Sequence, residues 1–67
     1  MKRQPTDMDI YRWAKLYIDE HGRHASAYAT TKAEAMLARG DLEGAGVWKR
    51  IVRAILEIQV TNGRTKH

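Results

Sequence analysis

The stretch Met36-Leu-Ala-Arg-Gly-Asp-Leu-Glu-Gly-Ala-Gly-Val-Trp-Lys-Arg-Ile51 contains the signals that decide the fold. Gly40 suits the left-handed position that follows a helix, and Asp41 suits the cap position that precedes one. A connection this short returns the chain antiparallel to itself. The sequence therefore predicts an antiparallel helical hairpin that turns at Gly40 and Asp41.

The segment after the turn, Leu42 to about Val60, is predicted to be the strongest helix. Large apolar side chains recur in it at steps of three and four residues, which is the spacing of one helix face. They are Trp48, Ile51, Ile55 and Ile58. Asn62 and Gly63 predict the end of this helix, so residues 61–67 are expected to form a basic tail.

The segment before the turn carries small side chains along one helix face. Ala25, Ala29 and Ala33 recur every fourth residue and are followed by Leu37. Small residues allow a neighbouring helix to approach closely. We therefore expect a helix over about residues 24–39 that packs against the helix after the turn.

A further helix is predicted at the N-terminal end. Thr6 and Asp9 have the spacing of a capping box, in which each side chain bonds the backbone N–H of the other residue. Gly22 suits the end of this helix, and residues 1–5 are expected to form a disordered leader. Together these signals predict an all-α domain over residues 6–60, built as a small three-helix bundle.

The predicted core combines the apolar stripes of the three helices. Its members are Ile10, Trp13, Tyr17, Ala29, Ala33, Met36, Leu37, Trp48, Ile51, Val52, Ile55 and Ile58. Both tryptophans lie within such stripes, so we expect them in the interior rather than at a partner surface.

Length and cysteine content exclude several classes of protein. A chain of 67 residues has room for one hydrophobic core. Without cysteine it can hold neither a disulfide nor a thiolate nucleophile nor a Cys-based zinc site. Its longest apolar run, residues 35–38, is far shorter than a signal-peptide core or a membrane span. We therefore expect a cytoplasmic protein that does not engage a membrane.

The formal net charge of +4 and the sequence pI of about 9.8 raise the question of nucleic-acid binding. The excess positive charge comes from Lys2, Arg3, Arg64 and Lys66 near the chain ends, whereas residues 6–60 hold equal numbers of basic and acidic side chains. Two charges at each end neutralise few phosphates, so their affinity for a polyanion would be weak. We expect these ends to act as solubilising tails.

Nucleic-acid binding is the alternative function, through a basic stripe on the last predicted helix. Lys49, Arg50 and Arg53 share one face of that helix and could contact phosphates together with the basic ends. Asp41 and Glu43 would stand at the start of such a recognition helix, where they repel phosphate. A nucleic-acid partner is therefore disfavoured.

The residues that could carry chemistry lack the arrangement that chemistry needs. His21 and His24 straddle the predicted break at Gly22 rather than sharing one helix face as zinc ligands do. The carboxylates have no pocket that would exclude water, and the hydroxyl side chains lack the turn that presents a serine nucleophile. We therefore expect no catalytic activity, no cofactor and no metal site.

Residues 28–60 resemble a single helical hairpin of the tetratricopeptide type. The matching positions are Gly40 and Asp41 at the turn, followed by Leu42, Ala45, Trp48 and Val52. Over the whole chain, the pattern Ala-x-x-x-Ala, Gly-Asp-x-x-Gly and Trp-x-x-Ile-x-x-Ala-Ile more closely resembles a family of short uncharacterised bacterial proteins. That resemblance implies helices and a bacterial origin, and it implies no functional residues.

Apolar and small residues cover about two thirds of the circumference of the helix predicted from Leu42. Val47, Leu56 and Val60 lie at the margins of this arc and are candidate interface residues. Exposed apolar surface on a small protein usually marks an interface, and a twofold homodimer is the commonest closed assembly. We therefore expect a homodimer with this helix near the axis. The expected function is a small protein-interaction or regulatory module with an unknown protein partner.

Overall fold

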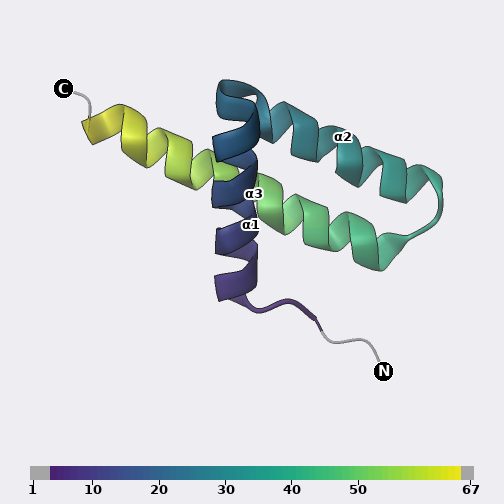
Figure 1. Cartoon of the computed structure of the whole chain (residues 1–67). Coiled ribbons are helices and arrows are strands. Elements are labelled where there is room, and N and C mark those ends of the chain that lie inside the picture. The colour runs from purple at the N-terminus through teal and green to yellow at the C-terminus, as the bar shows by residue number, and fades with distance from the viewer. Residues whose placement is uncertain (1–3, 66–67) are drawn as a thin grey trace.

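The computed structural model describes residues 4–65, which contain three α-helices (Figure 1). Helix α1 is Asp7–His21, α2 is Ala25–Ala38 and α3 is Leu42–Thr65, and a 3-10 turn, Gly22–His24, joins α1 to α2. No strand is present in residues 4–65, so the predicted all-α class is confirmed.

Two helical stretches pack together. The first is a bent path made of α1, the 3-10 turn and α2, and the second is α3. α2 lies along α3 in the opposite direction, whereas α1 runs across α3 rather than along it (Figure 1). Only the 3-10 turn separates α1 from α2, and the chain bends there instead of reversing (Figure 1). The result is a helical hairpin with a crossing helix, which departs from a bundle of three aligned helices.

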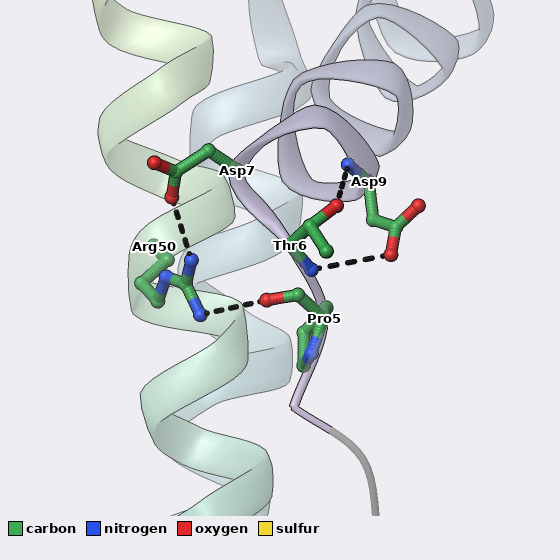
Figure 2. A network of polar contacts seen from close by, with 5 residues as sticks. All are labelled: Pro5, Thr6, Asp7, Asp9 and Arg50. Carbon is green, nitrogen blue, oxygen red and sulfur yellow. Dashed lines mark hydrogen bonds and ion pairs between the residues drawn. The ribbon is translucent and has the colours of Figure 1, made fainter.

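Helix α1 begins and ends where its sequence predicts. The Thr6 hydroxyl accepts a hydrogen bond from the Asp9 backbone N–H at 3.1 Å, and the Asp9 carboxylate accepts one from the Thr6 N–H at 3.2 Å (Figure 2). At the other end, Gly22 has a φ of +58° and its N–H donates to the Ile18 carbonyl. Both ends thus satisfy backbone groups that a helix leaves without partners.

The turn between α2 and α3 also has the predicted geometry. Gly40 has a φ of +80°, and its N–H donates to the Leu37 carbonyl at 3.0 Å. The Asp41 N–H donates to the Met36 carbonyl at 2.8 Å, which completes a Schellman motif at the end of α2. The Asp41 carboxylate then caps α3 by accepting a hydrogen bond from the Gly44 N–H at 2.9 Å.

Helix α3 extends to Thr65, beyond the end predicted near Val60. Asn62 and Gly63 lie within the helix, so the prediction that they end it is wrong. Each disfavours a helix by only about 1 kcal/mol or less, which the hydrogen bonds of a continuing helix can offset. The last residues of the predicted tail, 66–67, and residues 1–3 of the predicted leader lie outside the described residues.

The buried core is small and rich in alanine. It consists of Ile10, Ala14, Ala25, Ala29, Ala33, Ala45, Ile51 and Ile55. The half-buried members of the predicted core are Tyr17, Met36, Trp48, Val52 and Ile58. Trp13 is 40% exposed and Leu37 is 44% exposed, so the prediction that both are core residues is wrong. Alanine occupies the lines of closest helix contact, and these two larger side chains stand at the flanks.

The Gly-Asp turn should make a measurable contribution to stability. Gly40→Val should lower the free energy of unfolding by about 1 kcal/mol or more, because a β-branched side chain is poorly suited to a positive φ. Asp41→Ala should lower it by about 1 kcal/mol, because the Gly44 N–H loses its cap. Urea melts measure both changes, and two variants that melt like the parent chain would contradict this turn.

Two glycines in α3 differ in the space around them. A Cβ atom on Gly44 would lie 2.6 Å from the Asp41 carboxylate, whereas a Cβ on Gly46 would meet nothing within 4 Å. Gly46→Ala should therefore raise the free energy of unfolding by about 0.5–1 kcal/mol, the usual gain in a helix. Gly44→Ala should give no such gain, because it displaces the Asp41 cap.

The same glycine substitutions in an Asp41→Ala chain provide the control. With the cap already absent, Gly44→Ala should stabilise the chain by an amount closer to that of Gly46→Ala, as urea melts would show. The Met36 sulfur, 3.1 Å from the added Cβ, is then the neighbour that must still move. Equal stabilisation by the two substitutions in the parent chain would instead mean that Asp41 does not pack on Gly44.

Candidate interaction surface

An aromatic cluster lies where the three helices meet. The ring centroid of Tyr17 lies 5.2 Å from that of Trp48 and 5.7 Å from that of Tyr28. His21 stacks on Tyr28 with ring centroids 4.0 Å apart. Burial raises the pKa of the Tyr17 phenol, and the neighbouring Tyr28 and Glu20 raise it further. Because its rings come from α1, α2 and α3, the cluster holds α1 against the hairpin.

One edge of this cluster opens into a hollow between α1 and α3. The hollow has a volume of about 310 Å³ and is lined by Trp13, Leu16, Tyr17, Val47, Trp48 and Ile51. Leu16 is 50% exposed at its rim, beside the exposed indole of Trp13. We call this surface the α1–α3 hollow. Its lining is apolar and aromatic throughout.

Two carboxylates share the side of α1 that carries the rim of the hollow. Asp9 precedes Trp13 by four residues and Glu20 follows Leu16 by four, so helical spacing places all four side chains in one row. Arg12 lies three residues after Asp9 and four before Leu16, so it flanks this row. The row therefore has an acidic group at each end and one arginine beside it.

The structure separates the candidate interface residues that the sequence indicates. Val47 is half buried and lines the α1–α3 hollow, whereas Leu56 and Val60 are exposed. Nine residues separate Val47 from Leu56, which corresponds to about two and a half helical turns and places them on opposite sides of α3. The three residues therefore belong to two different surfaces.

Within the basic stripe of α3, Arg50 takes part in a contact that belongs to the fold. Its guanidinium donates to the Asp7 carboxylate at 2.9 Å and to the Pro5 carbonyl at 3.3 Å (Figure 2). These bonds tie the start of α1 to α3. Lys49 and Arg53 are exposed, and they are the members of the stripe that a polyanion could reach without displacing this contact.

The polar and titratable side chains of residues 4–61 lie outside the buried core. Every buried side chain among residues 4–61 is apolar. His21 belongs to the aromatic cluster and His24 is exposed in the 3-10 turn. No three His, Asp or Glu side chains in the described part of the chain lie close enough to hold a metal ion. None of the described helices combines the length and the apolar character needed to cross a membrane.

Sequence reasoning missed the side chains that join distant elements. Gln59 donates to the Gly22 carbonyl at 3.0 Å and holds the bend between α1 and α2 against α3. Neither this bond nor the Arg50–Asp7 pair has a local signal, because the partners are 37 and 43 residues apart. Leu16 did have a usable signal, since it lies three residues from Trp13 on the flank of an apolar stripe.

The fold and its surfaces do not lead to a known family. No family model, no curated protein and no solved structure matches this chain. The case for a function therefore rests on the chain's own residues and their contacts.

Proposed function

We propose that this chain is a small protein-interaction module that binds a partner through the α1–α3 hollow. The observation that carries the proposal is the exposure of Trp13 and Leu16 at the rim of an apolar hollow between two helices. Indole rings bury a large area on contact and are enriched among the side chains that dominate binding energy. Apolar surface of this kind favours a partner that covers it.

The floor of the hollow is held in place by the fold. Trp48 and Tyr17 pack with ring centroids 5.2 Å apart, and Ile51 is buried. Side chains that are already ordered lose little conformational entropy when a partner binds. A side chain of the partner could therefore enter the hollow without rearrangement of the three helices.

The composition of the surface indicates the chemistry of the partner. The lining is apolar, so the partner should supply a large apolar side chain to a space of about 310 Å³. Asp9 and Glu20, at either end of the row that contains Trp13 and Leu16, favour Lys or Arg beside that anchor. We therefore expect a peptide segment of the partner with one apolar anchor and flanking basic residues.

A binding role also agrees with the character of the described residues. Their buried side chains are all apolar, so no titratable side chain is fully withdrawn from water in the way that tunes a general acid or base. The lack of cysteine agrees with a reducing, cytoplasmic setting. The first of these observations favours a module that acts by association.

Substitution of the rim should remove partner binding and leave the helices intact. In this test the chain is immobilised and incubated with a lysate of the cells that express it, and the retained proteins are quantified by mass spectrometry. Trp13→Ala and Leu16→Ser should each lower retention of the partner about tenfold or more, the effect expected of side chains at an interface centre. Tyr11→Ala is the matched control, because Tyr11 is also half exposed on α1 but lies outside the hollow.

Circular dichroism of each variant checks that helical content is unchanged. A partner retained equally by the parent chain and by Trp13→Ala would refute this interface. Loss of the partner with Tyr11→Ala alone would place the binding surface on another side of α1.

The nucleic-acid alternative has a direct test. Arg50 is held by Asp7 and Pro5, so only Lys49 and Arg53 of the basic stripe are free to contact phosphates. So few phosphate contacts give weak, salt-sensitive binding. Mobility-shift assays with mixed DNA and RNA should show no complex near physiological salt. A sequence-specific complex that survives there would favour the nucleic-acid function over the proposed one.

A further inference from the structure

A second hollow lies between α2 and α3. It has a volume of about 370 Å³ and is lined by Thr30, Ala33, Glu34, Leu37, Lys49 and Val52, so none of its lining comes from α1. Leu37 is one of the large apolar side chains that the fold leaves exposed. We call this surface the hairpin groove. It shares no lining residue with the α1–α3 hollow.

Apolar side chains of α3 continue the groove toward the C-terminal end of that helix. Leu56 follows Val52 by four residues and Lys49 by seven, and Val60 follows Leu56 by four, so helical spacing places them along one stripe. Leu56 is 47% exposed and Val60 is also exposed. The groove is therefore the start of a longer apolar strip, which the exposed Arg53 borders.

The outer face of α2 is suited to burial. Its exposed residues are Ala27, Thr30, Thr31, Glu34, Ala35, Leu37 and Ala38. Glu34 is the one charged residue in this set. The Thr30 hydroxyl donates to the Ser26 carbonyl at 2.8 Å and the Thr31 hydroxyl to the Ala27 carbonyl at 3.0 Å. Both hydroxyls would keep these hydrogen bonds if a partner covered the face. This removes the main cost of burying threonine, which is an unsatisfied hydroxyl.

The charges beside the groove are arranged for a second copy of the same chain. Glu34 lies on α2 and Lys49 on α3, on the two helices that border the apolar floor. A twofold axis parallel to the hairpin places α2 of one copy over α3 of the other. Glu34 of each copy then faces Lys49 of the other copy, so the surface is complementary to itself.

We propose that the hairpin groove is the interface of a twofold-symmetric homodimer, in which α2 of each copy packs on α3 of the other. The two hairpins then form a four-helix core, with Leu37, Val52 and Leu56 in its interior. A chain with so small a core gains stability from burying this additional apolar surface. The homodimer is independent of the proposed function, because the hairpin groove and the α1–α3 hollow share no lining residue.

Charge reversal tests the pairing between copies. Light scattering coupled to size exclusion at micromolar concentration should give the mass of two chains for the parent. Glu34→Lys and Lys49→Glu should each raise the dimer dissociation constant about tenfold or more, because each places like charges together twice per dimer. An equimolar mixture of the two variants should recover the dimer, since one copy then carries cations and the other anions at both positions.

Two further variants serve as controls for net charge. Glu20→Lys and Lys15→Glu change the net charge by the same amounts on α1, outside the groove, and should leave the dimer unchanged. A parent chain that keeps the mass of one copy on tenfold concentration overturns the proposal. The proposal is also overturned if charge reversal on α1 weakens the dimer as much as charge reversal in the groove.

A pair of leucines of matched exposure tests the apolar strip. Leu56 and Leu16 are 47% and 50% exposed, on the strip and on the α1–α3 hollow respectively. Leu56→Glu should shift the dimer to monomer, and Leu16→Glu should not, with circular dichroism confirming that both remain helical. Dissociation by Leu16→Glu alone would assign the interface to the α1–α3 hollow and overturn the hairpin dimer.

Discussion

Close packing of alanine against isoleucine is the constraint on which the rest of the structure depends. Ala25 and Ala29 place almost no side chain between α2 and α3, so the two helices approach closely around Ile51 and Ile55. Close packing of this kind is stable only if the interior has no voids. The contact lines therefore have no room for large side chains, and these are displaced to the flanks of each helix.

That displacement explains why so short a chain presents large apolar side chains at its surface. Trp13 and Leu37 have the helical spacing of core residues, yet each is at least two-fifths exposed. The free energy that their burial could supply is still available to a second molecule. One flank forms the α1–α3 hollow and another the hairpin groove, so the same constraint produces two separate apolar surfaces.

Polar contacts in the described residues cap the helices and join them near their ends. Thr6 and Asp41 cap helix starts with bonds to residues three positions away. Arg50 bonds Asp7 at the start of α1, and Gln59 bonds Gly22 at the bend between α1 and α2. Exposed contacts of this kind contribute little each to the free energy of folding. The Arg50 and Gln59 bonds add to the packing contacts between α1 and α3.

The sequence by itself determined the local structure, because a cap at Thr6 or a positive φ at Gly40 involves residues within a few positions of each other. It also determined that three helices would form. Only the tertiary structure decided along which line of each apolar face the helices meet, since periodicity defines a broad face and not the line of contact within it. That line buried Ala14 and left its neighbour Trp13 at the surface. It also brought Arg50 to Asp7, 43 residues away, and so made a candidate phosphate contact into a tie between α1 and α3.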